Sequence, residues 1–270
     1  MECDHCFVWG SPHSSGTMSI ESVRSILRQA RDVPSIEWIY FEGGEPFLHY
    51  PLLVQAVTES HEAGFKVGIV TNAYWATSVA DALLWLQPLA GRISDFSVSS
   101  DLFHSDQPSS PESENAAVAA RRLGMPVGII SVRDDTLMYR GRAAEKLVHG
   151  RIHHPWERFS TCPHENLAEP GRVHVDPFGN IHICQGIVVG NLFNAELKRI
   201  CDEYDPATHP IAGPIVREGP AGLVRHHRLP IDDEYVDACH LCYSARVALR
   251  ERDSEFLVPD QMYGRFARRD

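Results

Sequence analysis

The cysteines are the residues of this chain best suited to chemistry. They stand at Cys3, Cys6, Cys162, Cys184, Cys201, Cys239 and Cys242. Cys3 and Cys6 have the Cys-x-x-Cys spacing, and so do Cys239 and Cys242. The number of cysteines, seven, is odd. With no signal-peptide pattern before them, this usage favours metal or cluster ligation over a disulfide framework.

Four of these cysteines stand on or beside a predicted hairpin and a predicted helix. Apolar and polar residues alternate over residues 172–183 around a Pro-Phe-Gly-Asn turn, which predicts a hairpin. Cys162 precedes this hairpin and Cys184 ends it, while Cys239 and Cys242 open the last predicted helix. Four thiolates from such elements can enclose an iron-sulfur cluster or a tetrahedral zinc ion equally well.

A glycine-rich turn follows a short apolar run at residues 38–41. The run is β-branched or aromatic, so it predicts a buried strand, and Gly43 and Gly44 allow a sharp turn at its carboxyl end. Glu45 and Pro46 complete the turn. Ligands of parallel α/β folds bind at this end of a strand, although a lone Gly-Gly-Glu is also common in turns without a ligand.

Together, Cys3-Asp4-His5-Cys6 with the following Phe7 and the turn at residues 43–46 resemble the motifs of the radical S-adenosylmethionine (SAM) family. In that family a Cys-x3-Cys-x2-Cys loop holds a 4Fe-4S cluster, SAM chelates its fourth iron, and a Gly-Gly-Glu-Pro turn receives the SAM amino group. The resemblance implies that Cys3 and Cys6 ligate the cluster and that Gly43, Gly44, Glu45 and Pro46 bind SAM. It also implies that His5 stacks beside the adenine, the alternative being a solvated loop residue.

The match departs from the family pattern at its start. If Cys3 and Cys6 are the second and third motif cysteines, the first would fall just before Met1, and so would the family's first strand. Two protein thiolates and one SAM would leave an iron without a protein ligand. We therefore expect a start assigned too late, or a truncated gene.

The later cysteines resemble the auxiliary-cluster domain of many radical SAM enzymes, which is of the SPASM or the shorter twitch type. Cys162, the Gly179-x4-Cys184 hairpin and Cys239-x2-Cys242 match its ligand pattern, and no cysteine follows Cys242, which favours the twitch version. The resemblance implies a second 4Fe-4S cluster. Zinc is the alternative by ligand chemistry.

Several polar residues near strand ends are weaker candidates for SAM binding. Ser99 and Asp101 stand where the family places groups for the SAM ribose, and the fork of Arg133 would suit the SAM carboxylate. His104 and Asp106 are candidates for substrate contact. A helix cap, a solvated loop or a surface arginine would explain the same residues.

Elements of helical and strand period alternate along the first half of the chain. Helices are predicted over residues 19–31, 51–63, 78–86 and 110–123, and strands over residues 38–41, 65–71, 93–99 and 126–132. This alternation predicts an α/β fold with a parallel sheet and right-handed crossovers. The resemblance implies a partial (β/α)6 barrel that lacks its first strand.

The pattern changes near residue 150, where prolines, glycines and cysteines become frequent. We expect residues 1–150 to form the radical SAM core and residues 151–270 a small α+β cluster-binding domain with a tail. Helices are predicted over residues 192–204 and towards residue 252, with little periodicity over 205–235. Cys201 shares a helical face with Leu197, Ile200 and Tyr204, which predicts a buried core thiol.

Composition bounds the remaining possibilities. A formal net charge of −11 and a pI near 5.7 argue against a nucleic-acid or membrane-surface binder, and no apolar run is long enough to cross a bilayer. A cytoplasmic protein is expected. No Walker loop, nucleophile elbow or metal-binding histidine array is present in the sequence.

The resemblance predicts a radical SAM enzyme of the oxidoreductase or maturase type. Such an enzyme cleaves SAM reductively, and the resulting 5'-deoxyadenosyl radical abstracts hydrogen from a peptide or small-molecule substrate. An electron donor such as a flavodoxin or ferredoxin is implied. The alternative is a non-catalytic iron-sulfur or zinc protein derived from such an enzyme.

Overall fold

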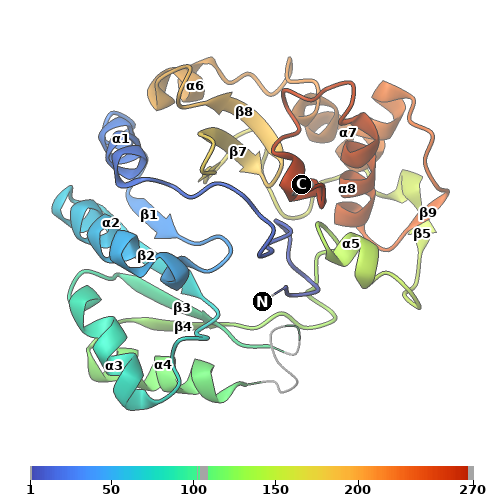
Figure 1. Ribbon diagram of the computed structural model, residues 1–270. Helices are drawn as coiled ribbons and strands as arrows, with labels where there is room; N and C mark the ends of the chain where they lie inside the picture. Colours follow the sequence, from blue (N-terminus) through green and yellow to red (C-terminus); the bar gives the residue numbers. More distant parts are fainter. Residues whose placement is uncertain (1, 102, 104–108, 267–270) are drawn as a thin grey trace. The chain divides into compact units, whose positions relative to one another are not determined.

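The computed structural model describes residues 2–101, 103 and 109–266, and its chain divides into two compact units (Figure 1). The sheet unit comprises residues 18–137. The cysteine unit combines the described residues up to Thr17 with those from Met138 onward. The division therefore differs from the boundary predicted near residue 150, because the first residues and residues 138–150 pack with the later part of the chain. The assignment of a radical SAM core and an auxiliary-cluster domain stays a prediction.

The sheet unit is built on a parallel sheet with strand order β1-β2-β3-β4, which confirms the predicted parallel α/β fold. Its strands are β1 (Trp38–Phe41), β2 (Lys66–Thr71), β3 (Asp95–Ser99) and β4 (Val127–Ile130). Its helices are α1 (Ile20–Arg31), η1 (Pro46–His49), α2 (Tyr50–Glu62), α3 (Val79–Leu86), η2 (Gln87–Leu89) and α4 (Pro111–Arg122). The partial barrel stays a prediction.

Local capping explains why three of these helices begin where the sequence predicts. Ser19, Ser78 and Ser110 have extended backbones, and the side chain of each accepts a hydrogen bond from the backbone N–H three residues later. A serine in this position satisfies one of the donors that a helix start leaves without a partner. The predicted starts of α1, α3 and α4 are confirmed within one residue.

The core of the sheet unit lies between one face of the sheet and the helices. Val67, Ile69 and Phe96 point into it from the strands, and Leu86 is fully buried there from α3. Strand β1 was predicted to be buried, but in the structure it is only half buried. Its side chains alternate, so that Trp38 and Tyr40 face away from this core and are 39% and 45% exposed.

The cysteine unit has antiparallel strands and helices (Figure 1). Strands β6 (His174–Val175), β7 (Asn180–Cys184) and β8 (Ile187–Asn191) form one sheet, and β5 (His154–Pro155) pairs with β9 (Glu234–Tyr235). The helices are α5 (Ala143–Lys146), η3 (Trp156–Arg158), α6 (Leu197–Glu203), α7 (Ala212–His227), α8 (Ala238–Leu249) and η4 (Asp260–Tyr263). The hairpin and the last helix are confirmed, whereas β8 and α7 were not predicted.

Cys201 is exposed, so its prediction as a buried core thiol is wrong. Helix α6 has seven residues and buries Leu197 and Ile200. On so short a helix the buried stripe is narrow, and Cys201 is turned out of it.

No helix in the described part of the chain is both long and apolar enough to cross a bilayer.

A matched pair of substitutions on α3 tests the packing of the sheet unit. Leu86 is fully buried and Leu84 is 69% exposed on the same helix. Leu86→Ala leaves a cavity in the core and should lower the free energy of unfolding by about 2–5 kcal/mol. Leu84→Ala should change it by less than about 0.5 kcal/mol. Urea unfolding monitored by circular dichroism measures both values, and equal losses would contradict the described core.

Candidate functional site

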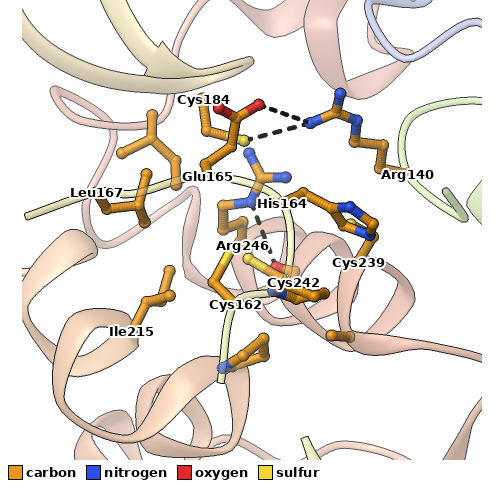
Figure 2. A pocket seen from close by; sticks show the side chains of 14 residues that line it. Arg140, Cys162, His164, Glu165, Leu167, Cys184, Ile215, Cys239, Cys242 and Arg246 are labelled. Carbon is orange, nitrogen blue, oxygen red and sulfur yellow. Dashed lines mark hydrogen bonds and ion pairs between the residues drawn. The ribbon is translucent and has the colours of Figure 1, made fainter. Parts of the chain in front are cut away.

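Figure 2 shows one pocket of the cysteine unit, and the four late cysteines Cys162, Cys184, Cys239 and Cys242 all line it. Cys162 lies in the loop after η3, Cys184 ends β7, and the other two stand near the start of α8. The space between atoms in the pocket, its mouth included, is about 410 Å³. Residues far apart in the sequence thus meet around one cavity, and their role as metal ligands stays a prediction.

The start of α8 places two of the thiols. The Asp237 side chain caps the helix by accepting a hydrogen bond from the His240 N–H at 2.7 Å, and its other oxygen accepts the Tyr139 N–H at 3.2 Å. Cys239 and Cys242 stand three residues apart on this capped turn, so their side chains share a helix face.

A kink in α7 places the Cys162 loop. Gly219 has a left-handed φ of +61°, and Pro220 follows inside the helix. A Cβ atom at Gly219 would come within 2.3 Å of the Ser160 carbonyl carbon. The Ala221 N–H beyond the kink donates to the Phe159 carbonyl at 3.0 Å. The glycine therefore lets the helix accept the backbone that leads into Cys162.

Two buried arginines accompany the thiols. Arg140 Nη1 lies 3.6 Å from Cys184 Sγ and 3.9 Å from a Glu165 carboxylate oxygen. Arg246 is 2% exposed, and its Nε donates to the Cys242 carbonyl at 3.3 Å. Burying a guanidinium costs free energy unless acceptors or negative charge surround it. The pocket is therefore electrostatically suited to anionic sulfur.

Burial raises the pKa of Cys242 to about 11 and that of Cys239 well above its ordinary value. Both thiols are protonated at neutral pH in the metal-free chain. A bound metal displaces such protons because the thiolate is the ligand, so loading of the pocket should release protons.

The described residues contain no group of three or more His, Cys, Asp or Glu side chains close enough to hold a single metal ion. A tetrahedral zinc ion draws its sulfur ligands to about 2.3 Å from one centre. The four thiols instead surround a cavity.

The early cysteines lie in a loop of the same unit. The Cys6 N–H donates to the Cys3 carbonyl at 3.1 Å, and Cys6 Sγ accepts the Gly10 N–H at 3.1 Å. Buried Arg142 donates from Nη1 to the Cys3 carbonyl at 2.6 Å and from Nη2 to the Gly10 carbonyl at 2.8 Å. Half-buried His5 lies within this turn. The loop is thus held in one conformation by a residue distant in sequence.

Gly141 allows this support to approach. Its φ is +59°, and a Cβ atom there would lie 2.5 Å from the Cys6 carbonyl oxygen. Residues 140–142 could not be identified from the sequence, because no local pattern distinguishes them. Arg246 was not predicted either, although its spacing of four residues from Cys242 on one helix was a usable signal.

The glycine-rich turn lies in the sheet unit, and its backbone is open. Gly43 has a φ of +128°, both glycines are exposed, and a Cβ atom at either would meet nothing within 4 Å. Glu45 is buried instead. One of its carboxylate oxygens accepts the Thr71 hydroxyl at 2.8 Å, and the other accepts the Asn72 N–H at 2.8 Å. Its side chain therefore joins the turn to the end of β2.

Pro46 is the first residue of η1, where its fixed φ favours the helix start. Ser99 ends β3, and its carbonyl accepts the Ser113 hydroxyl at 3.2 Å. Asp101 is buried, and its carboxylate accepts the Phe103 N–H at 2.9 Å and the Val132 N–H at 3.1 Å.

Arg133 is exposed and pairs with Asp135 at 3.1 Å. His104 and Asp106 lie outside the described residues. The candidate SAM-binding residues of the sheet unit thus hold structural contacts of their own, and their role in binding stays a prediction.

No family model matches the chain. The chain is 30% identical over 76 residues to YydG of Bacillus subtilis (strain 168), a protein named for peptide biosynthesis. The aligned segment covers 28% of this chain and 24% of YydG. It is 34% identical over 85 residues to the tungsten-containing aldehyde ferredoxin oxidoreductase cofactor-modifying protein of Pyrococcus furiosus, covering 31% of this chain and 23% of the relative. The matched segments thus cover about a quarter of each curated relative.

One solved structure resembles most of the chain. The crystal structure of BtrN in complex with AdoMet and 2-DOIA covers 81% of this chain and 82% of its own, with a TM-score of 0.55 and 19% sequence identity. At this identity the similarity establishes a shared fold. The fold and the two short sequence matches agree with the family resemblance of the cysteine and glycine motifs.

The buried carboxylate of Glu45 offers a test of the turn. Glu45→Gln would place an amide N–H₂ against backbone or hydroxyl donors, so the free energy of unfolding should fall by about 1–3 kcal/mol. Glu62→Gln, at an exposed position near the end of α2, is the matched control and should change it by less than about 0.5 kcal/mol. Urea unfolding measures both. No loss in Glu45→Gln would contradict the buried network.

The kink in α7 offers a test of the late pocket. Gly219→Ala should displace the loop that carries Cys162 and lower metal affinity by about 10-fold or more. Gly171→Ala is the control, because a Cβ atom there meets nothing within 4 Å. Metal retained after anaerobic loading with iron and sulfide, followed by gel filtration, is the measurement. Equal retention by both variants would show that the kink does not position the ligand.

Proposed function

We propose that this chain is a radical SAM enzyme, which cleaves S-adenosylmethionine reductively and abstracts hydrogen from a peptide or small-molecule substrate; the two short sequence matches and the shared fold support this. The observation that carries this proposal is the convergence of Cys162, Cys184, Cys239 and Cys242 on one pocket, in a chain that also has the Cys3-x-x-Cys6 and Gly-Gly-Glu-Pro motifs. When bound, the clusters and SAM supply the electron and the 5'-deoxyadenosyl radical. The protein binds, orients and shields them.

The late pocket would hold the auxiliary 4Fe-4S cluster through its four thiolates. All four thiols line one cavity, as a cluster with four thiolate ligands requires. Buried Arg140 and Arg246 would offset the negative charge that four thiolates bring. These features favour iron-sulfur over zinc at this site.

The early loop would supply Cys3 and Cys6 to the SAM-binding cluster. The N–H of Gly10 donates to Cys6 Sγ, and such a hydrogen bond stabilises the thiolate that iron requires. Arg142 keeps the loop in the required conformation through its bonds to the Cys3 and Gly10 carbonyls.

The glycine-rich turn would receive the SAM amino group. The open backbone of Gly43 and Gly44 can approach a ligand closely, while Glu45 anchors the turn from within. His5 would stack on the adenine, and Ser99 and Asp101 would contact the ribose. Arg133 would exchange its exposed partner Asp135 for the SAM carboxylate.

Both substrate classes have support among the similar proteins. YydG is named for peptide biosynthesis, and the BtrN structure contains the small molecule 2-DOIA with AdoMet. A flavodoxin or ferredoxin in the cytoplasm would supply the electron. A net charge of −11 disfavours a nucleic-acid substrate.

A second candidate is a non-catalytic iron-sulfur protein derived from such an enzyme. Four thiols line the late pocket, which can therefore hold a cluster independently of the early loop.

Cysteine replacement tests the auxiliary site. Cys162→Ser with Cys184→Ser removes two ligands, so the anaerobically loaded chain should lose about four irons and four sulfides relative to the parent. Cys201→Ser is the matched control, because this thiol is exposed and does not line the pocket. Zinc without acid-labile sulfide in the parent would overturn the proposed cluster.

Product analysis tests the enzyme. A chain extended upstream through the expected first strand and cysteine, loaded anaerobically with iron and sulfide, should form 5'-deoxyadenosine from SAM when a reductant is added. The same chain with Cys6→Ser should form none. A fully loaded extended chain that forms no 5'-deoxyadenosine would favour the non-catalytic candidate.

A further inference from the structure

Arg140 occupies a particular position among the residues that line the late pocket. It is 6% exposed, and its Nη1 lies 3.6 Å from Cys184 Sγ (Figure 2). The Glu165 carboxylate lies 3.9 Å from the same nitrogen, and the Phe7 ring centroid lies 5.1 Å from its Cζ. The guanidinium is thus held between a ring of the early loop and a thiol of the late site.

The hydrogen-bonding capacity of Arg140 is incompletely used. Its Nε is buried and has no hydrogen-bond partner in the described part of the chain. Arg246, by contrast, donates to the Gln185 carbonyl at 2.6 Å and contacts the Tyr263 hydroxyl at 3.3 Å, so it supports the backbone. A buried donor without a partner is costly. An anionic sulfur-rich group in the pocket would remove that cost.

We propose that Arg140 is a positioning residue for the auxiliary cluster: it donates a charge-assisted N–H···S hydrogen bond to the Cys184 thiolate and makes the reduction potential of the cluster less negative. This inference rests on the proposed function, because it requires a cluster in the late pocket. An added electron increases the negative charge of the cluster, and a fixed buried cation stabilises the reduced form more than the oxidised form.

The early loop contributes to the same contact. Phe7 follows Cys6 directly and lies against the Arg140 guanidinium. The two residues after Arg140 also contact the early loop: Gly141 lies close to the Cys6 carbonyl, and the Arg142 N–H donates to that carbonyl. Loss of the Phe7 ring would free the guanidinium to turn away from Cys184. Phe7→Leu should therefore move the potential in the same direction as loss of Arg140, by a smaller amount.

The experiment compares Arg140→Met, Arg140→Lys and a matched control in a chain that also carries Cys3→Ser and Cys6→Ser, so that the late pocket is the cluster site under study. The control is Arg172→Met, because Arg172 pairs with the same Glu165 oxygen at 2.8 Å, is 62% exposed and does not line the pocket. Iron, acid-labile sulfide and the midpoint potential from EPR-monitored potentiometry are measured for each.

Arg140→Met should retain iron and sulfide and should shift the midpoint potential to a more negative value. Arg140→Lys, which keeps the charge and loses the planar fork, should lie between Arg140→Met and the parent. Arg172→Met should match the parent. These three results together support the role of Arg140.

An unchanged potential in cluster-loaded Arg140→Met, or an equal shift in Arg172→Met, would overturn the inference and leave the proposed cluster intact. If Arg140→Met loses its cluster, Phe7→Leu decides: the parent's potential in that cluster-loaded variant overturns the inference. If the parent itself retains no acid-labile sulfide, the proposed cluster fails and the inference fails with it.

Discussion

Buried positive charge beside buried sulfur is the constraint on which the cysteine unit depends. Arg140 and Arg246 lie among four thiols, and burial alone would penalise both the guanidinium groups and any thiolate. In the metal-free chain Arg246 is offset by the Cys242 and Gln185 carbonyls, to which it donates. The raised pKa values of Cys239 and Cys242 show the same balance in the metal-free chain, where the thiols keep their protons. Cations that bind sulfur would shift this balance towards thiolate.

The architecture around the pocket serves this constraint. The Asp237 cap orients the first turn of α8, and the kink at Gly219 admits the backbone that leads to Cys162. Residues 140–142 then join the late site to the early cysteine loop within one unit. In the sheet unit, Glu45 performs a comparable task, because its buried carboxylate fixes the glycine-rich turn to the end of β2.

Much of the sheet unit could be predicted from sequence, because its signals are local. Hydrophobic period and serine caps locate α1, α3 and α4, and short apolar runs locate the strands. Helix α7 escaped prediction since Gly219 and Pro220 interrupt its period, and β8 because register shifts in its pairing with β7 distort the alternation. Cys201 is exposed although helical periodicity placed it on the buried face, so periodicity alone can assign one residue too many to that face.

Some residues of the candidate site could likewise be predicted from the sequence, and others could not. The meeting of the four late cysteines could be expected from the family resemblance, because its Cys-x-x-Cys and hairpin-end motifs are local features, whereas their role as ligands stays a prediction. Arg140, Gly141 and Arg246 could not, because a charged or small residue reveals its role only through contacts with residues distant in sequence. The open glycines at the turn were predicted, whereas the inward engagement of Glu45 depends on the neighbouring strand.

Mössbauer spectroscopy of the chain loaded anaerobically with ⁵⁷Fe and sulfide tests the central claim most directly, because it reports the chemical state of every bound iron. In a chain that carries Cys3→Ser and Cys6→Ser, the account predicts the quadrupole doublet of a [4Fe-4S]²⁺ cluster, retained after Cys201→Ser and lost after Cys162→Ser with Cys184→Ser. A spectrum of isolated mononuclear iron, or a cluster signal that survives loss of both pocket cysteines, would contradict it.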